Sequence, residues 1–473
     1  MNEKRLLELP KTGIWLNAAP ATLQELRGCP VAIAFVNGAS IWSMQRLAEV
    51  TGWQARNPGR LQLVVVQVPR FEFEREPQQA LKLLRRQGIS APIVLDAQWD
   101  AWRAFDVQSW PTLVLLDAYG VERERLVGGG AGGDTERVLN ALCDGVAQPL
   151  DDEAYGAREI NPEPRLPLRF PAGLAVAEER LYVADTGNHR ILECNHAGRV
   201  LRQFGLGSAD LINGGVGEAA FNRPQGLALV RDVLYVADTG NHALRRINLS
   251  SGQVDTLCGT GRVGDPRAGV LAQPWDSPLN HPADVAVADN QVHIAMAGDN
   301  HIWSYDLGTR ELRWRSGAGS VEVRDGSGHL AAFAQPTSVV AVQQTLYVCD
   351  SLGSAIRSVQ LRNDLVQTLV GQGPWESGNV DGPRLNARLQ FPMAIAKGPD
   401  SPMLWIADSG NGTLRTLRLG GGDLATVNLP RRLHGPCALG LAAGAIWIAE
   451  TDAHSVLRFD PLSGELSDVP IEG

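Results

Sequence analysis

The chain has 473 residues, more than one hydrophobic core usually organises, so two or more domains are expected. Hydrophobic residues make up 44% of the chain and charged residues 20%, a balance typical of a soluble globular protein. The formal net charge of −9 is spread along the chain, which argues against nucleic-acid binding because such proteins need a basic stripe.

Six cysteines lie far apart, with no C-x-x-C pair and no histidine at zinc spacing. The pattern predicts neither a disulfide framework nor a zinc site, and reduced, buried thiols are typical of a cytoplasmic protein. The N-terminal segment MNEKRLLELPKTGIW is polar, so no signal peptide is predicted. Apolar stretches fall far short of the ~18 residues of a membrane helix. We therefore expect a cytoplasmic protein that binds no membrane.

Strand and helix patterns alternate in the first 148 residues. The run PVAIAFVNG (30–38) predicts a buried strand, and the apolar spacing over residues 40–56 predicts a helix. LQLVVVQVP (61–69) is typical of a parallel strand, and PQQALKLLRRQG (77–88) predicts a helix that ends at Gly88. Further strands are predicted over 91–96, 112–120 and 121–129, with a last helix over 134–145. The alternation indicates an α/β layer.

A phrase that recurs six times dominates the rest of the chain. LYVADTGNHRI (181–191) returns almost letter for letter over 234–247, and weaker copies begin at residues 292, 346, 404 and 446. The copies are 42 to 58 residues apart, a period that indicates a repeat architecture. Each copy follows a proline motif such as FPAGLAV (170–176) by about ten residues, so each repeat holds several short strands. Six such repeats predict a six-bladed β-propeller.

An acidic residue closes the strand in most copies, at Asp185, Asp238, Asp350 and Asp408. Its carboxylate can accept hydrogen bonds from amides of the tight turn that follows, or it can bind a metal ion. We favour the structural role, because the residue belongs to the repeat. Glycine-rich links over 204–221, 258–271, 317–333 and 371–391 are expected to form loops on one face, where propellers bind.

The phrase V-x-D-x-x-N-x-x-I resembles the NHL repeat. The first region resembles a thioredoxin-like domain, through Trp15-Leu16-Asn17, LQELRGCPVAIAF (23–35) and SWPTLVLLDAYG (109–120). The order of the two parts resembles the NHL-repeat-containing protein 2 family and its bacterial relatives, over nearly the whole chain. The expected organisation is an α/β thioredoxin-like domain over 1–148, a proline-rich acidic linker over 149–169 and an all-β six-bladed NHL propeller over 170–473.

The chain departs from this resemblance at the position of the redox cysteines. Thioredoxin-like enzymes carry C-x-x-C at the start of a helix, where this chain reads Ser40-Ile41-Trp42-Ser43. A serine hydroxyl cannot replace the thiolate in dithiol exchange, and Ser40 suits helix capping instead. A serine nucleophile needs a histidine base, and the first histidine in the chain is His189. We expect a degenerate site with no catalytic residue.

Trp110-Pro111-Thr112 matches the cis-proline loop of thioredoxin-like proteins. The resemblance implies a backbone edge at Pro111 that pairs with an extended peptide. Trp42 and Trp110 are expected either to line that groove or to pack in the core, and the sequence leaves both alternatives open.

A second candidate site follows from the polar residues around the prolines that begin the inner strands. We expect them to surround the mouth of a central channel and to form a ligand-binding rim, the alternative being a water-filled channel. The rim residues are Arg223, Gln225, His281, Asp284, Gln335, Thr337 and Ser338.

The leading hypothesis is a non-catalytic binding or scaffolding protein with a protein or peptide partner, no nucleic acid, no cofactor and no bound metal. One alternative is a hydrolase or lyase with a metal at the channel mouth, where His281 and Asp284 come nearest to a ligand pair. The other is a family-type thiol-disulfide or peroxide activity, which Ser40 and Ser43 oppose.

Overall fold

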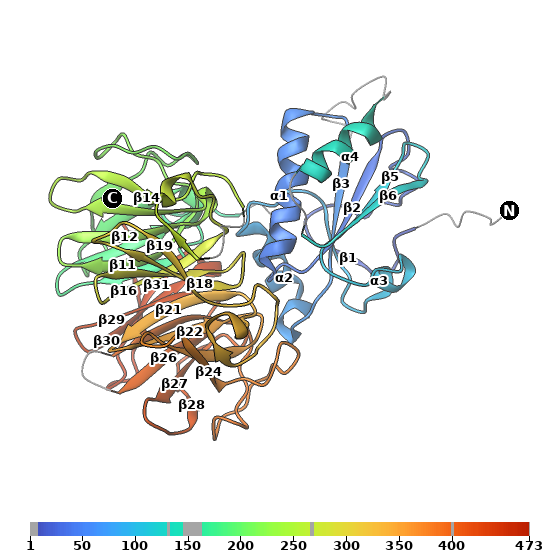
Figure 1. Cartoon of the computed structure of the whole chain (residues 1–473). Helices are drawn as coiled ribbons and strands as arrows, with labels where there is room; N and C mark the ends of the chain where they lie inside the picture. The colour runs from blue at the N-terminus through green and yellow to red at the C-terminus, as the bar shows by residue number, and fades with distance from the viewer. Residues whose placement is uncertain (1–7, 130–132, 145–162, 265–268, 399–401, 473) are drawn as a thin grey trace. The chain divides into compact units, whose positions relative to one another are not determined.

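The computed structural model describes residues 8–129, 133–144, 163–264, 269–398 and 402–472 (Figure 1). The chain forms two compact units, Met1–Pro164 and Arg165–Gly473, and each is described by itself. Most of the expected linker, residues 149–162, lies outside the described residues. Glu163, where the described chain resumes, pairs with Lys82 at 2.6 Å and with Arg85 at 3.0 Å, which fixes this end of the linker to the first unit.

The first unit is built on a sheet with strand order β1-β4-β3-β2-β5-β6. Its strands are β1 (Ile14–Trp15), β2 (Val31–Val36), β3 (Gln62–Gln67), β4 (Ile93–Leu95), β5 (Thr112–Leu116) and β6 (Glu122–Val127). Its helices are α1 (Ile41–Arg56), α2 (Pro77–Arg85), α3 (Asp100–Ala104) and α4 (Gly133–Cys143). Strands β2, β3 and β4 run parallel, and β5 and β6 add an antiparallel hairpin beside β2.

Both faces of this sheet are covered, which explains why β2 and β5 are buried at every position and apolar at all of them except Thr112. Helices α1, α2 and α4 cover one face, with Leu47, Leu84 and Leu139 fully buried against alternate residues of the strands. Helix α3 and the N-terminal segment cover the other face, where Phe35 and Phe105 stack with ring centroids 5.2 Å apart.

The second unit consists of six antiparallel sheets, each built from consecutive strands (Figure 1, green to red). The first three blades hold β7 (Gly173–Val176), β8 (Leu181–Asp185), β9 (Arg190–Cys194), β10 (Val200–Phe204); β11 (Pro224–Val230), β12 (Val233–Asp238), β13 (Ala243–Asn248), β14 (Val254–Cys258); and β15 (Val270–Leu271), β16 (Pro282–Ala288), β17 (Gln291–Met296), β18 (His301–Asp306), β19 (Leu312–Ser316). The last three hold β20 (Gly326–Ser327), β21 (Pro336–Val342), β22 (Thr345–Asp350), β23 (Ala355–Gln360), β24 (Leu365–Val370); β25 (Pro392–Lys397), β26 (Met403–Asp408), β27 (Thr413–Arg418), β28 (Leu424–Thr426); and β29 (Pro436–Ala442), β30 (Ala445–Glu450), β31 (Ser455–Phe459), β32 (Leu466–Val469). The six-bladed propeller predicted from the repeats is confirmed.

The inner strands close a ring. Strands β7, β11, β16, β21, β25 and β29 each lie beside the inner strand of the next blade, and β29 lies beside β7. Beyond the last strand, Glu472 exchanges backbone hydrogen bonds with Val200 at 2.8 Å and with Gly198 at 3.1 Å in blade 1. The end of the described chain is thus bonded to the outer edge of the first blade, which joins segments far apart in sequence.

The glycine-rich links run along the outer edges of the blades before they reach the inner strands. β15 pairs with β19 and β20 pairs with β24, so these links add a fifth strand to blades 3 and 4. In blade 2 the link makes a single bridge, with Gly214 and Val254 exchanging two backbone hydrogen bonds. Described residues of these three links therefore pair with the outer strands of their blades.

Candidate functional site

The acidic residue that ends the second strand of a blade ties two segments of that blade together. In blade 2, Asp238 is fully buried, and its Oδ1 accepts the amide of Asn222 at 2.8 Å. Its Oδ2 accepts Asn241 Nδ2 at 2.8 Å and Arg245 Nη1 at 2.7 Å. The same amide bond, from the residue two places before the inner-strand proline, recurs at Asp185, Asp350, Asp408 and Glu450.

The structural role predicted for these carboxylates is confirmed, but the predicted partner is wrong. The bonded amide belongs to the chain segment that leads into the inner strand, not to the turn that follows the carboxylate. In blade 1 the two groups, Arg169 N and Asp185 Oδ1, are 2.7 Å apart and 16 residues apart in sequence. The turn contributes a side chain instead, because Asn188 Nδ2 donates to Asp185 Oδ2 at 2.9 Å.

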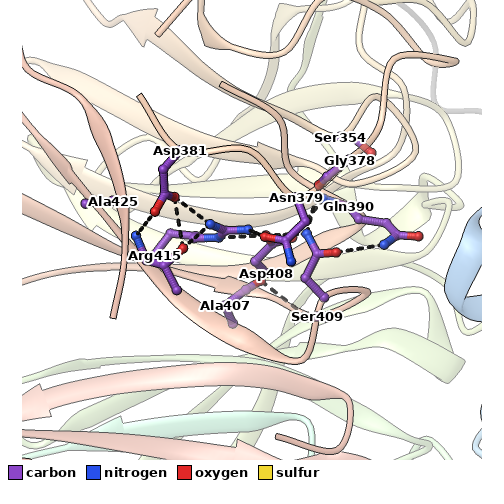
Figure 2. A network of polar contacts seen from close by, with 12 residues as sticks. Ser354, Gly378, Asn379, Asp381, Gln390, Ala407, Asp408, Ser409, Arg415 and Ala425 are labelled. Atoms are coloured by element: carbon purple, nitrogen blue, oxygen red, sulfur yellow. Dashed lines mark hydrogen bonds and ion pairs between the residues drawn. The ribbon is translucent and has the colours of Figure 1, made fainter. Parts of the chain in front are cut away.

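In three blades a buried arginine joins the same carboxylate to the link. Figure 2 shows the network in blade 5, where Arg415 Nε donates to Asp408 Oδ2 at 2.9 Å and Nη1 donates to Asp381 Oδ1 at 2.6 Å. The guanidinium also contacts Asn379 and Thr426. Arg245 and Arg357 occupy the matching position in blades 2 and 4 and are also fully buried. These arginines hold the links on the blades, so they are part of the framework.

Neighbouring blades are joined through the residue that ends the turn after the second strand. Its side chain accepts the amide of the residue before the next inner-strand proline. The bonds are Arg223 N to His189 Nδ1 (3.1 Å), His281 N to His242 Nδ1 (3.0 Å), Gln335 N to Asn300 Oδ1 (2.9 Å), Phe391 N to Ser354 Oγ (3.3 Å) and Phe170 N to His454 Nδ1 (3.0 Å). The last bond closes the ring between blades 6 and 1. His189 and His242 were interpreted as repeat residues, and this contact is their role.

The residues held by these bonds have unusual backbone conformations. Every residue before an inner-strand proline has a positive φ: Phe170 (49°), Arg223 (51°), His281 (57°), Gln335 (69°), Phe391 (51°) and Gly435 (56°). For a residue with a side chain this conformation costs on the order of 1–3 kcal/mol and persists only where neighbours fix it. The hydrogen bonds from the preceding blade supply that constraint. Backbone strain of this kind gathers at functional sites, which marks these positions as a candidate site.

We define the mouth ring as the two residues before each inner-strand proline, because all six inner strands begin there. Its members are Arg169, Phe170, Asn222, Arg223, Asn280, His281, Ala334, Gln335, Gln390, Phe391, His434 and Gly435. The ring contains two arginines and two histidines but no aspartate or glutamate. Arg169 and His434 are exposed, and Arg223 and His281 are partly exposed.

Burial favours the neutral form of three histidines at or beside the ring, His189, His242 and His281. It lowers the pKa of His242 to about 4 and, together with the charges of His242 and Arg223, that of His281 to about 3. The pKa of His189 is lowered by burial and by the charges of Arg223 and Arg169.

We expect protonation linked to His242 and His281 to destabilise the folded protein as the pH falls from about 6.5 towards 4. In this range the unfolded chain binds protons that folded His242 and His281, with pKa values of about 4 and about 3, do not bind. Each histidine should contribute a slope of up to about 1.4 kcal/mol per pH unit. Urea unfolding across this range should show that His242→Gln/His281→Gln loses less stability than the wild type.

The raised pKa values of Asp238, Asp284 and Asp408, each about 6, act in the opposite direction. Stability from these carboxyls is present below pH 4 and is lost as the pH rises through 6. Because this contribution is common to wild type and variant, it cancels in the difference between them. A difference that stays constant with pH would contradict the assignment of neutral, buried histidines.

Asp284, a predicted rim residue, links blades 3 and 4. Its Oδ2 accepts Ser338 Oγ–H at 2.7 Å and Val339 N–H at 2.9 Å, and its Oδ1 accepts Val285 N–H at 2.9 Å. Burial raises its pKa to about 6, against the effect of these hydrogen bonds. Ser338 Oγ in turn accepts the amide of Ile395 in blade 5 at 3.2 Å. The carboxylate is therefore used within the inner ring.

The other predicted rim residues divide into two groups. Gln335, Thr337 and Ser338 are buried, with 4%, 7% and 5% of their surface exposed, so they offer little surface to a partner. Gln225 is partly exposed, and its carbonyl group lies against Gly173 of blade 1. Arg223 and His281 reach solvent within the mouth ring. The sequence analysis missed Arg169 and His434. A comparison of the residues that lie two positions before each inner-strand proline would have found them.

Ser40 and Ser43 occupy unlike positions at the start of α1. Ser40 is the residue before the first helical turn, as predicted, but its side chain makes no capping hydrogen bond. It is partly exposed, whereas Ser43 is fully buried and its Oγ accepts the amide of Asn37 at 3.2 Å. Beneath this loop Asn37 Nδ2 donates to both carboxylate oxygens of buried Glu74 at 2.8 Å. Burial raises the pKa of Glu74.

The Trp110–Pro111 peptide bond is cis, as the resemblance implies. Pro111 is buried and its carbonyl accepts Gly128 N–H at 2.7 Å, while the carbonyl of Ser109 accepts Thr112 Oγ1–H at 2.8 Å. The two carbonyl groups that flank Trp110 in the chain are therefore already hydrogen-bonded within the domain.

The two tryptophans of the candidate groove lie in different surroundings. Trp110 packs with Trp99 at 5.2 Å and with Trp102 at 4.8 Å between ring centroids, and all three are partly exposed. Trp42 is partly exposed and packs beside Gly129. Trp110 thus contributes to core packing and to the surface at once.

The described residues also bear on the alternative functions. Across 8–129, 133–144, 163–264, 269–398 and 402–472, no group of three or more His, Cys, Asp or Glu side chains is placed to hold a metal ion. Asp284 bonds towards blade 4, whereas His281 is bonded through its amide to blade 2. All six cysteines are buried, and none of them forms a disulfide bond. Within the same residues, no helix has the length and apolar character needed to cross a membrane.

Comparison with known proteins agrees with this architecture. The NHL repeat model matches residues 168–194 and 221–247, which lie in blades 1 and 2. The chain is 28% identical to "NHL repeat-containing protein 2" of Bos taurus, covering 98% of this chain and 71% of that protein. It is 30% identical to the Gallus gallus protein of the same name, covering 87% and 62%. It is also 30% identical to "Protein SUPPRESSOR OF QUENCHING 1, chloroplastic" of Arabidopsis thaliana, covering 98% and 47%.

The second unit is a six-bladed β-propeller, and its first two blades match the NHL repeat. Over most of its length the chain is a homologue of NHL repeat-containing protein 2.

Proposed function

We propose that this protein is a non-catalytic binding protein whose propeller takes a protein or peptide partner at the mouth ring. The observation that carries the proposal is the ring itself. Five strained backbone positions are fixed around the propeller axis by side chains of the preceding blade, and Gly435 adopts the same positive φ in blade 6. A rigid, polar surface of this kind suits recognition, because the protein loses little conformational entropy when a partner binds.

The links expose apolar side chains, and we propose that some of them add to partner binding. Large exposed apolar side chains are found at many interfaces. On the four links they are Leu206, Ile212, Val216, Val263, Val270, Leu330, Trp375, Val380 and Leu385, and Trp275 follows shortly after the second link. Trp375, 67% exposed, and Trp275, 49% exposed, are the strongest anchor candidates because tryptophan dominates binding energy at interfaces.

Affinity capture from the native host tests the proposal. The full chain is compared with Arg223→Ala/His434→Ala, which alters exposed mouth-ring side chains, and with Arg418→Ala, which removes an exposed arginine of β27. We expect a partner in stoichiometric amount on the wild type and on Arg418→Ala, and its loss on the ring variant. Retention of the partner by a folded ring variant would exclude the mouth ring as its binding site.

We also propose that the first unit is a thioredoxin-like domain that has lost dithiol chemistry, over residues 1–148, followed by the linker 149–169 and the propeller 170–473. Three features support this assignment: α1 follows directly after β2, β2 and β3 are parallel, and the antiparallel hairpin β5–β6 begins after Pro111. Trp42, Trp110 and Pro111 then form its peptide-facing surface, next to Ser40 and Ser43.

Restoring the cysteines should restore dithiol exchange. Ser40 is partly exposed and Ser43 is buried, the arrangement that an attacking and a resolving thiol require, and the start of α1 lowers the pKa of a thiol placed there. We expect Ser40→Cys/Ser43→Cys to form a disulfide and to reduce insulin with dithiothreitol as reductant, whereas the wild type should show no turnover.

The single variants Ser40→Cys and Ser43→Cys are the matched controls and should not turn over. Robust insulin reduction by the wild type would overturn the proposed loss of dithiol chemistry. A folded double variant that forms no disulfide would contradict the thioredoxin-like placement of these two residues.

We also propose a compartment for the protein and roles for the predicted rim residues. Six buried cysteines that form no disulfide fit a reducing compartment such as the cytoplasm. The rim residues Arg223, Gln225, His281, Asp284, Gln335, Thr337 and Ser338 are divided between surface contact, for Arg223, Gln225 and His281, and support of the ring, for the others. A metal-dependent hydrolase or lyase has no support from the bonds of Asp284, because all its hydrogen bonds run to propeller groups.

A further inference from the structure

Three of the glycine-rich links carry the same kind of residue pair where they meet the outer strand of their blade. An asparagine or aspartate is followed by a glycine. The pairs are Asn213-Gly214, Asp325-Gly326 and Asp381-Gly382. The glycines have φ angles of 154°, 151° and 124°, and each pairs with the outer strand. A side chain would be strained in this conformation, so the structure requires glycine as the second residue of the pair.

In blades 4 and 5 the first residue of the pair is an aspartate that joins the link to the blade. Its Oδ1 accepts hydrogen bonds from the buried arginine of the blade and from a threonine of the outer strand. The distances to the arginine and the threonine are 3.1 and 2.6 Å for Asp325, and 2.6 and 2.9 Å for Asp381. In two of the three links, the side chain bound at this position is therefore a carboxylate.

Asn213 makes the same two contacts in blade 2 with an amide oxygen. Its Oδ1 accepts Arg245 Nη2–H at 3.0 Å and Thr256 Oγ1–H at 2.9 Å. Asn213 is exposed, and its Nδ2 donates to no other residue in the described part of the chain. The two donors would therefore suit the aspartate that forms if Asn213 loses its amide nitrogen.

The chain contains two further Asn-Gly pairs, and hydrogen bonds hold the side-chain amide of both. Asn37 is 1% exposed, and its Nδ2 donates to both carboxylate oxygens of Glu74 at 2.8 Å. Asn411 Nδ2 donates to Gly378 O at 2.8 Å and to Asp408 Oδ2 at 2.7 Å. These two pairs are internal controls for the exposed pair at Asn213.

We propose that Asn213 is a site of spontaneous deamidation, and that its aspartate product keeps the contacts with Arg245 and Thr256. The nitrogen of Gly214 attacks Cγ of Asn213, the Cγ–Nδ2 bond breaks, and ammonia leaves with the proton of the Gly214 amide. Water then adds to Cγ of the succinimide and breaks its bond to the Gly214 nitrogen, which regains a proton. The net reaction converts asparagine and water to aspartate and ammonium.

The contacts of Asn213 favour the first step. Negative charge develops on Oδ1 when a nitrogen attacks Cγ, and hydrogen-bond donors fixed on that oxygen lower the barrier. At Asn213 these donors are a guanidinium and a hydroxyl group. By contrast, Asn37 Oδ1 has no hydrogen-bond partner among the described residues, and Asn411 Oδ1 accepts the neutral amide of Gln390 at 2.8 Å.

The backbone of the pair must open before the attack. Gly214 N–H donates to Val254 O at 3.2 Å, in a single bridge outside the regular strands. Local opening of such an isolated surface contact costs far less than global unfolding. At Asn37 and Asn411 the side-chain hydrogen bonds of the departing amide must open as well, and each adds to the barrier.

Peptide mapping by tandem mass spectrometry, after prolonged incubation of the folded full chain at mildly alkaline pH, tests the site. We expect Asn213 to deamidate at least about tenfold faster than Asn37 or Asn411, because hydrogen bonds hold the amide of those two residues. Fragment ions separate Asn213 from Asn222, which lies in the same tryptic peptide. In urea the three rates should become similar, because unfolding removes all of these contacts.

The variant Asn213→Asp tests whether the product fits. It should fold, with a urea midpoint no lower than that of the wild type, whereas Asn213→Ala should lower the midpoint because it removes the acceptor. Digestion with an endoproteinase that cleaves before aspartate but not before isoaspartate measures the two products of the succinimide. We expect a higher ratio of aspartate to isoaspartate in the folded protein than in urea, since Arg245 and Thr256 bind the normal backbone linkage.

Two kinds of result would overturn the inference. Deamidation of Asn213 no faster than that of Asn37 and Asn411 in the folded protein would exclude the site. A lowered midpoint of Asn213→Asp, or the same ratio of products in folded and unfolded protein, would exclude the fit of the aspartate. The proposed binding function depends on the mouth ring and stands or falls separately.

Discussion

Replacing Gly173 with alanine is expected to prevent stable folding of the propeller. A β-carbon at this position would lie 1.8 Å from the carbonyl oxygen and 2.8 Å from the carbonyl carbon of Gln225. Both atoms belong to the backbone of the next inner strand, and the inner strands form a closed ring, so neither strand can move away alone. We expect a loss of more than about 4 kcal/mol in the free energy of unfolding, or no folded protein at all.

Urea unfolding followed by tryptophan fluorescence measures this effect. Gly215→Ala is the matched control, because its nearest neighbour is 3.6 Å away at the flexible end of Glu218. The control should change the free energy of unfolding by no more than about 0.5 kcal/mol. Equal stability of Gly173→Ala and Gly215→Ala would show that the inner strands of blades 1 and 2 are not packed as described.

Replacing Arg415 with methionine is expected to destabilise the propeller by about 3–5 kcal/mol at neutral pH. The substitution leaves the fully buried carboxylate of Asp408 without its guanidinium partner, and it releases Asp381 of the link (Figure 2). The double variant Arg415→Met/Asp408→Asn should recover part of the loss, because the uncompensated charge is gone while an amide oxygen remains for Gln390 N–H.

The pH dependence of this effect has a definite sign. The pKa of Asp408 is already raised to about 6 by burial and is held down by Arg415. Without the arginine it rises further, so the carboxyl is neutral over a wider range and the deficit of Arg415→Met shrinks as the pH falls from 7 to 5. Urea unfolding at both pH values checks this, with Arg418→Met as the exposed control. A deficit that does not depend on pH would mean that the buried charge is not its cause.

The strands of the propeller were predictable because the same local sequence pattern occurs in all six repeats. Prolines at the start of the inner strands and the β-branched second strands specify local structure that each blade repeats. The first unit was predictable for a similar reason: continuous apolar runs at β2 and β3 indicate strands buried on both faces. Short elements without a periodic pattern, such as β1 and α3, were missed.

The contacts of the repeat residues could not be predicted from one copy, since their partners lie elsewhere in the chain. The bond between Phe170 and His454 joins residues 284 positions apart. The bond between Asp284 and Ser338 spans 54 residues and crosses from one blade to the next. The sequence alone predicted a place for Asp284 on a ligand-binding rim but could not predict the hydrogen bonds by which its carboxylate joins two blades.

Blade 3 shows how the framework accommodates a departure from the repeat. Met296 stands where blades 2, 4 and 5 have aspartate, and Trp303 stands where they have the buried arginine. With no carboxylate at the strand end, Trp303 Nε1 donates instead to Asp299 of the turn at 3.1 Å. The third copy of the phrase is weak in the sequence because blade 3 has a hydrogen bond from a tryptophan where blades 2, 4 and 5 have an aspartate–arginine ion pair.

The central claim, a binding protein that recognises its partner at the mouth ring, is tested most directly by hydrogen exchange on the complex with a captured partner. The account predicts that peptides covering residues 165–170, 222–225 and 279–284 gain protection when the partner binds, and that Arg223→Glu abolishes the gain. Protection confined to the first unit or to the outer strands of the blades, with the mouth ring unchanged, would contradict it.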